Sequence, residues 1–258
     1  MLSNDESFAK KSEAEKTTPR YFSVLGVVVL DIGLLLLVWF MAMIVATAFW
    51  TLGEYLSNAG HISPKAEPGA TAQLLISLLG LYFAVMVLSF WRTRKLHFPP
   101  EQISTRKMVL LGISTGALLF LLTLAITNAL EYAGLGSKPS NQALLEDFSK
   151  QSPIAVVLFT VVLAPIFEEL LFRKLLFARL AQANHLITAY LLSGLLFALM
   201  HEPSPTNGGA DWLLKLLIYG FMGAIFAWVY KKTGNLWPAI LAHASNNLFG
   251  ILTLFLFA

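Results

Sequence analysis

Three charged side chains lie close together in an otherwise apolar stretch. Pro165–Arg173 reads PIFEELLFR, within an apolar run that begins near residue 153. On a helix, Glu169 and Arg173 are neighbours on one face, in the order that favours attraction. Glu168 points about 100° away from this pair. An ionised side chain inside a bilayer costs from a few to more than ten kcal/mol, so the left-over carboxylate of Glu168 predicts a functional site.

Two later apolar segments each contain a histidine. The first ends at His201, and the second contains His243 with Asn247 one helical turn after it. A carboxylate and two imidazoles can activate a water molecule by general base catalysis. Glu168, His201 and His243 could instead hold a zinc ion with an open position for water. Asn247 is a poor zinc ligand but a good hydrogen-bond donor to an oxyanion, which favours the metal-free chemistry.

The same residues also have purely structural interpretations. The Glu169–Arg173 pair could be a clamp, and either histidine alone could form a hydrogen bond between helices. Asp31 and Asn128 are expected to form such interhelical hydrogen bonds. Three polar positions at compatible depths in three segments are harder to explain by structure alone. Pro165 predicts a kink that frees backbone groups.

The composition predicts the environment of these residues. The chain has 258 residues, of which 57% are hydrophobic and 13% are charged, about half the charged fraction of a soluble domain. This predicts an all-α, polytopic membrane protein. The absence of cysteine excludes disulfide bonds and thiolate sites. The net charge of +3 gives no support for nucleic-acid binding.

Apolar stretches long enough to cross a bilayer predict about seven transmembrane helices. They lie near residues 22–51, 72–91, 107–130, 153–180, 185–201, 212–230 and 236–257. Lysine and arginine gather in residues 1–20, 92–107, 173–179 and 231–232, which predicts a cytoplasmic N-terminus. We expect a disordered cytoplasmic tail over residues 1–21 and one helical membrane domain over residues 22–258. Without organelle-targeting features, the expected location is a prokaryotic plasma membrane.

The polar residues form three motifs on successive predicted spans. These are E-E-x-x-x-R (Glu168, Glu169 and Arg173), F-x-x-x-H (Phe197 and His201) and H-x-x-x-N (His243 and Asn247). Each motif alone is weak, but their order and spacing together resemble the CPBP family. That family contains the CAAX-processing endopeptidases and the Abi proteins of bacteriocin processing or immunity. The resemblance covers roughly residues 140–257.

This resemblance implies an all-helical intramembrane endopeptidase that is either glutamate-dependent or a zinc metalloprotease. It implies that Glu168 and His201 activate water, while His243 and Asn247 stabilise the oxyanion. The expected partners are a membrane-associated protein or peptide substrate and the lipid bilayer. A non-proteolytic membrane regulator or bacteriocin-immunity protein of the same fold is the alternative. An ion-coupled transporter is a third interpretation, although no internal repeat is visible.

Overall fold

The computed structural model describes residues 21–57, 70–96, 98–99, 103–135, 149–150, 152–205 and 208–257. These residues are almost entirely helical and contain no strand. Five helices are long and apolar enough to span a membrane, and two shorter apolar helices cover Leu79–Thr93 and Leu186–His201. The prediction of an all-α membrane protein with about seven helices is therefore confirmed. The predicted tail, residues 1–21, lies almost wholly outside the described residues.

The helices follow the predicted spans closely. The first three are α2 (Tyr21–Ser57), α3 (Ala70–Thr93) and α4 (Thr105–Tyr132). The fourth span is one continuous helical run of five pieces, namely α6 (Pro153–Val157), η1 (Leu158–Leu163), α7 (Ala164–Glu169), η2 (Leu170–Phe177) and α8 (Ala178–Gln182). The last three are α9 (Leu186–His201), α10 (Gly209–Thr233) and α11 (Leu236–Phe257).

The chain divides into two compact units. One unit consists of Leu25–Lys95. The other consists of Met1–Val24 and Leu96–Ala258. The first unit therefore contains most of α2 and all of α3, and the second contains every predicted site residue. A single membrane domain over residues 22–258 remains a prediction.

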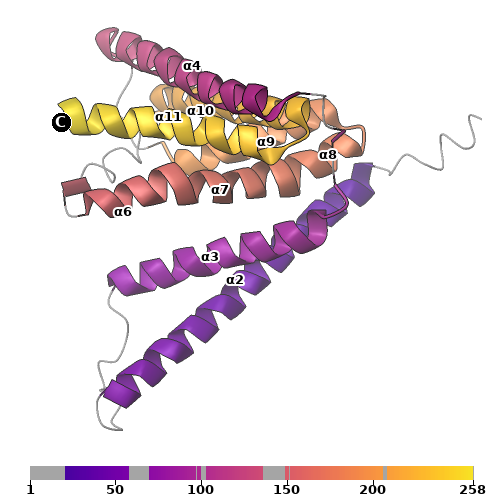
Figure 1. The fold of residues 1–258 in the computed structure, drawn as a ribbon, viewed down its shortest axis with the longest axis vertical. Helices are drawn as coiled ribbons and strands as arrows, with labels where there is room; N and C mark the ends of the chain where they lie inside the picture. Colours follow the sequence, from indigo (N-terminus) through magenta and orange to yellow (C-terminus); the bar gives the residue numbers. More distant parts are fainter. Residues whose placement is uncertain are drawn as a thin grey trace, which may run out of the picture. The chain divides into compact units, whose positions relative to one another are not determined.

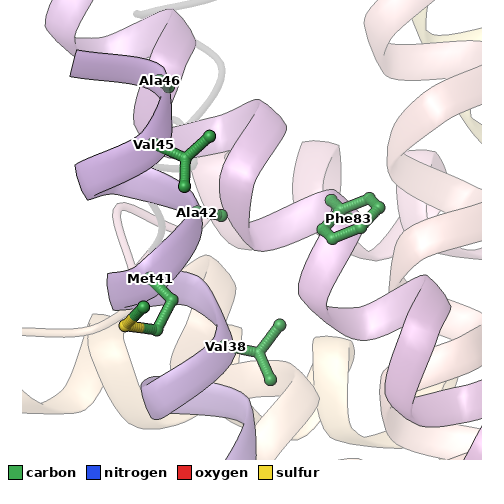
Figure 2. A pocket seen from close by; sticks show the side chains of 6 residues that line it. All are labelled: Val38, Met41, Ala42, Val45, Ala46 and Phe83. Atoms are coloured by element: carbon green, nitrogen blue, oxygen red, sulfur yellow. The ribbon is translucent and has the colours of Figure 1, made fainter. Parts of the chain in front are cut away.

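In the unit of α2 and α3, one ion pair joins the two helices. The Arg92 Nε atom lies 2.7 Å from Asp31 Oδ1, so the prediction of an interhelical bond from Asp31 is confirmed. The Asn128 side chain in α4, for which the same was expected, is exposed. Figure 2 shows a pocket of about 410 Å³ between α2 and α3. Its lining is wholly apolar and offers no group for catalysis: Val38, Met41, Ala42, Val45, Ala46 and Phe83.

In the larger unit, glycines bring pairs of helices into close contact. A Cβ atom on Gly116 of α4 would lie 2.2 Å from the Ala242 carbonyl oxygen of α11. A Cβ atom on Gly194 of α9 would lie 2.6 Å from the Gly220 carbonyl oxygen of α10. Small residues allow such close approach of membrane helices. Helices α4 and α11 run side by side in Figure 1, so this contact fixes α11 at the residue before His243.

The fourth span passes through Pro165 without ending, because π-helical turns lie on both sides of α7. In the first of them the Ala164 N–H donates to the Phe159 carbonyl, five residues earlier. The same register would pair the Thr160 carbonyl with the N–H of residue 165, which proline lacks. We therefore infer that Pro165 leaves the Thr160 carbonyl without a helical donor.

Candidate active site

The predicted pair between Glu169 and Arg173 is present in the larger unit and is fully buried. The Arg173 Nε atom lies 3.0 Å from Glu169 Oε2, and both side chains have no exposed surface. The Arg173 Nη2 group also donates to the Gly223 carbonyl of α10 at 3.1 Å. The guanidinium lies 4.7 Å from the ring centroid of Phe197 and 5.4 Å from that of Phe226. Its charge is thus compensated by a carboxylate, a carbonyl and aromatic faces.

Glu169 has a second partner that the sequence did not predict. Its Oε1 atom lies 3.0 Å from Nδ1 of His243 on α11. A carboxylate paired with arginine can only accept a hydrogen bond, so the proton of this contact belongs to His243 Nδ1. The Glu169 carboxylate therefore joins Arg173 to His243 and fixes the orientation of the imidazole.

His201 is oriented by a backbone group of its own helix. Its Nδ1 atom lies 2.9 Å from the Phe197 carbonyl, four residues earlier in α9. A carbonyl oxygen only accepts, so His201 Nδ1 carries a hydrogen. In the neutral imidazole, Nε2 then has a free lone pair. The spacing of F-x-x-x-H therefore places two groups of Phe197 against His201, namely the backbone carbonyl and the aromatic ring.

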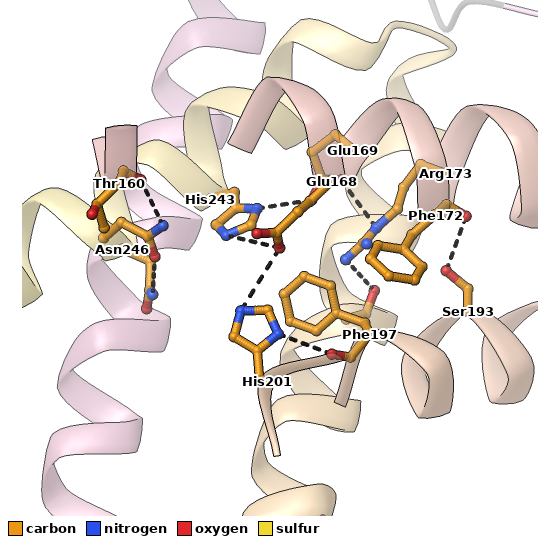
Figure 3. A network of polar contacts seen from close by, with 12 residues as sticks. Thr160, Glu168, Glu169, Phe172, Arg173, Ser193, Phe197, His201, His243 and Asn246 are labelled. Carbon is orange, nitrogen blue, oxygen red and sulfur yellow. Dashed lines mark hydrogen bonds and ion pairs between the residues drawn. The ribbon is translucent and has the colours of Figure 1, made fainter. Parts of the chain in front are cut away.

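The two histidines converge on Glu168, as Figure 3 shows. Glu168 Oε2 lies 3.7 Å from His201 Nε2 and 3.8 Å from His243 Nε2. Both distances are too long for hydrogen bonds. The Oε2 atom is buried and accepts a hydrogen bond from no described residue. Glu168 Oε2 and the two Nε2 atoms therefore face one another as hydrogen-bond acceptors. An additional proton, or a donor such as water, is needed to satisfy them.

This donor set has the right chemistry for zinc but not the right spacing. A carboxylate with two imidazoles is a known set of catalytic zinc ligands. Ligand atoms about 2.0–2.1 Å from a tetrahedral zinc ion lie about 3.3 Å apart, less than the 3.7 and 3.8 Å measured between Glu168 and the histidines. Among the residues that the structure describes, no group of three or more His, Asp or Glu is arranged to hold a metal ion. As placed, the three groups are more widely spaced than the ligands of one zinc ion.

Asn247 lies one turn after His243 on α11, and its hydrogen bonds go to Thr160 and Asn246 rather than to Glu168, His201 or His243. Its Nδ2 group donates to the Thr160 carbonyl at 2.9 Å, the carbonyl that Pro165 leaves without a helical donor. Its Oδ1 atom accepts from Asn246 Nδ2 at 3.2 Å. The Asn247 amide therefore ties α11 to the fourth span, and its second N–H hydrogen remains for another acceptor.

Aromatic residues of α10 complete the surroundings of the histidines. The ring of Tyr219 stacks on His201 with centroids 4.7 Å apart, and the ring of Phe226 stacks on His243 at 4.8 Å. Neither residue was among those predicted from the sequence. In an apolar span, their aromatic character looks the same as that of residues facing lipid, and only their spacing of seven residues on one helical face was a signal.

Comparison with known proteins adds an independent line of evidence. The family model described as type II CAAX prenyl endopeptidase Rce1-like matches residues 150–249. The protein named "Putative membrane peptidase YdiL" of Bacillus subtilis (strain 168) is 30% identical over 197 residues, which cover 73% of this chain and 75% of the relative. The chain belongs to the Rce1-like family of type II CAAX prenyl endopeptidases. This confirms the resemblance inferred from the three motifs, all of which lie within the matched residues.

Other relatives of this Rce1-like protein are also bacterial. The UPF0177 protein YvdC of Lactococcus lactis subsp. lactis (strain IL1403) is 30% identical over 172 residues, 66% of this chain and 62% of the relative. The UPF0177 protein YxdF of the same strain is 36% identical over 107 residues, 41% of this chain and 54% of the relative. The chain therefore spans less than two thirds of the length of these two proteins. No solved structure matches it. The apolar helices and the bacterial relatives identify a multi-pass membrane protein of the CAAX-protease-like peptidase type.

Proposed function

We propose that this protein is an intramembrane endopeptidase that hydrolyses a peptide bond of a membrane-associated protein or peptide at the Glu168–His201–His243 site. The observation that carries the proposal is the buried Glu168 Oε2 atom, which faces Nε2 of two histidines whose Nδ1 atoms are bound elsewhere. Neither histidine can turn its Nδ1–H toward Glu168 without losing its own partner. The three groups are thus held ready for a water molecule instead of being satisfied by one another.

The charges of the cluster favour one particular resting state. Glu168 and Glu169 contribute two negative charges, and Arg173 contributes one positive charge. An uncompensated charge in a buried site is costly, so one additional proton makes the cluster neutral. His243 is the best place for it, because Glu169 accepts from its Nδ1 and its Nε2–H then points to the Glu168 side of the site.

In the proposed reaction, water donates one proton to Glu168 while its oxygen attacks the carbonyl carbon of the substrate peptide. His201 Nε2 accepts the second hydrogen bond of this water and orients it. The developing oxyanion accepts from His243 Nε2–H and from the second hydrogen of the Asn247 amide. The C–N bond then breaks, and the proton held by Glu168 passes to the leaving amine nitrogen. The second proton of the water stays on the attacking oxygen and ends on the new carboxyl group, so the products are a carboxylic acid and an amine, and no metal takes part in any step.

Cleavage in a natural mixture of membrane proteins tests this proposal without assuming a substrate. Purified wild-type protein and the Glu168→Gln variant are each reconstituted with membrane proteins from a bacterial host, and new protein termini are quantified by mass spectrometry. We expect termini that appear only with the wild-type protein. On a substrate found in this way, Glu168→Gln and His201→Ala should each lower turnover at least about a hundredfold, as for loss of a general base. Near-normal cleavage by purified Glu168→Gln would overturn the assignment.

A further inference from the structure

Helix α10 carries none of the motif residues, yet one of its faces contacts both histidines and Arg173. Tyr219, Gly223 and Phe226 are spaced by four and three residues, so they share a face of the helix. Tyr219 stacks on His201, Phe226 stacks on His243, and the Gly223 carbonyl accepts from Arg173. Gly223 also lies close to α9, since a Cβ atom there would be 3.1 Å from Gly194 Cα. This packing brings the aromatic face of α10 against the two histidines.

Of the two stacked rings, Tyr219 acts on the histidine that has the weaker support. The His243 imidazole is held by the buried Glu169 carboxylate, a charge-assisted bond. The His201 imidazole is held by a neutral carbonyl of its own helix. A single hydrogen bond at Nδ1 leaves the ring free to rock about the bond direction, and such rocking moves Nε2 relative to Glu168.

Two aromatic rings lie close to the His201 ring. The Phe197 centroid lies 4.5 Å from the His201 centroid with an interplanar angle of 34°. The Tyr219 centroid lies 4.7 Å away with an angle of 23°. Stacked rings at these distances attract one another and resist tilting. The nearly parallel ring of Tyr219 therefore opposes the motion that the Nδ1 hydrogen bond leaves free.

We propose that Tyr219 is a positioning residue of the hydrolytic site, whose aromatic ring holds the His201 imidazole so that Nε2 faces Glu168. This inference rests on the proposed function, because it assigns His201 to water activation. It concerns the ring of Tyr219 and not its hydroxyl group. A misplacement of about 1 Å in a reacting group can lower the rate about a hundredfold, so even a modest loss of alignment is measurable.

The test compares Tyr219→Leu with Tyr219→Phe, and uses Tyr190→Leu as a matched control. Tyr190 is also a partly buried tyrosine of the same unit, and its ring contacts Phe177 at 4.8 Å. We expect Tyr219→Leu to lower kcat about tenfold with KM within about twofold, because alignment is lost and substrate binding is kept. Tyr219→Phe should keep kcat within about twofold of wild type, and so should Tyr190→Leu. An unchanged kcat in Tyr219→Leu, or an equal loss in Tyr219→Phe, overturns the proposal.

A second readout does not depend on activity. In the folded wild-type protein, the ring current of Tyr219 should shift the NMR signal of the His201 Cε1 proton, which is assigned by its loss in His201→Ala. Tyr219→Phe should keep this shift, whereas Tyr219→Leu should remove the part that comes from Tyr219 and leave the part that comes from Phe197. A His201 signal at the same position in Tyr219→Leu as in the wild-type protein contradicts the stacking itself. If Glu168→Gln cleaves normally while the shift behaves as expected, the proposed function fails but the ring contact does not.

Discussion

An arginine–carboxylate pair lies in each unit, and the two pairs differ in what surrounds them. Arg92 and Asp31 join α2 to α3, and the Arg92 side chain is 25% exposed. Arg173 and Glu169 have no exposed surface, and the Glu169 carboxylate continues to His243. The pair alone therefore does not mark a site. The larger unit differs because Glu169 also binds His243, and His243 faces the unsatisfied carboxylate of Glu168.

Neutralising the carboxylate of each pair should produce the largest difference in turnover between the two pairs. Glu169→Gln removes the charge that orients and stabilises His243, so we expect turnover to fall at least about a hundredfold. Asp31→Asn removes the matching charge from the pair with Arg92 and should leave turnover within about threefold of wild type. Cleavage rates of the two purified variants on one substrate give the comparison. Equal losses would mean that the pairs have equivalent, structural roles.

Removing the arginines should separate the pairs by stability. Arg173→Ala leaves Glu169 as a buried charge without its arginine, and breaking a buried pair costs about 3–5 kcal/mol. Arg92→Ala should cost about 1 kcal/mol or less, because its partly exposed pair is weakened by solvent. Thermal unfolding in detergent measures both variants. Normal yield and an unchanged Tm for Arg173→Ala would show that the Glu169–Arg173 pair is not a structural clamp.

The Asn247 amide gives a smaller effect that tests the account of Pro165. Asn247→Ala leaves the part-buried Thr160 carbonyl without its side-chain donor, so we expect a cost at or below the roughly 1–3 kcal/mol of a fully buried unsatisfied acceptor. Pro165→Ala restores a backbone N–H at the position where the π-helical register needs one. We therefore expect the double variant Asn247→Ala/Pro165→Ala to lose less stability than the sum of the single variants. Strict additivity of the Tm changes would contradict the link between Pro165 and Asn247.

Activity separates the two roles of Asn247 in the same variants. If its second N–H stabilises the oxyanion, turnover should fall roughly a hundredfold or more, and Pro165→Ala should restore stability without restoring turnover. Recovery of both properties in the double variant would mean that Asn247 only supports the helix. The two measurements together therefore assign the amide to one role or to both.

Local features of the site could be predicted from the sequence because they depend on spacing along one helix. The apolar lengths gave the seven helices, and the spacing of four residues gave the Glu169–Arg173 pair. The hydrogen bond between Glu169 and His243 joins residues 74 positions apart. The periodicity of a single helix cannot predict a contact between two helices so far apart in the sequence. The bond from Asn247 to Thr160 depends on a π-helical register that apolar residues do not reveal. Tyr219 was not predicted because the hydropathy of a sequence does not depend on whether an aromatic ring stacks against a histidine.

The dependence of activity on bound zinc is the measurement that tests the proposed chemistry most directly. The metal content of the purified protein is varied by chelation and by zinc titration, and turnover is measured in each sample. Because the spacing of Glu168, His201 and His243 does not match a zinc site, we expect full turnover in metal-free protein. Chelators that reach the site should then have no effect. Turnover that rises in proportion to zinc, with about one equivalent at saturation and loss of binding in His243→Ala, would contradict the account.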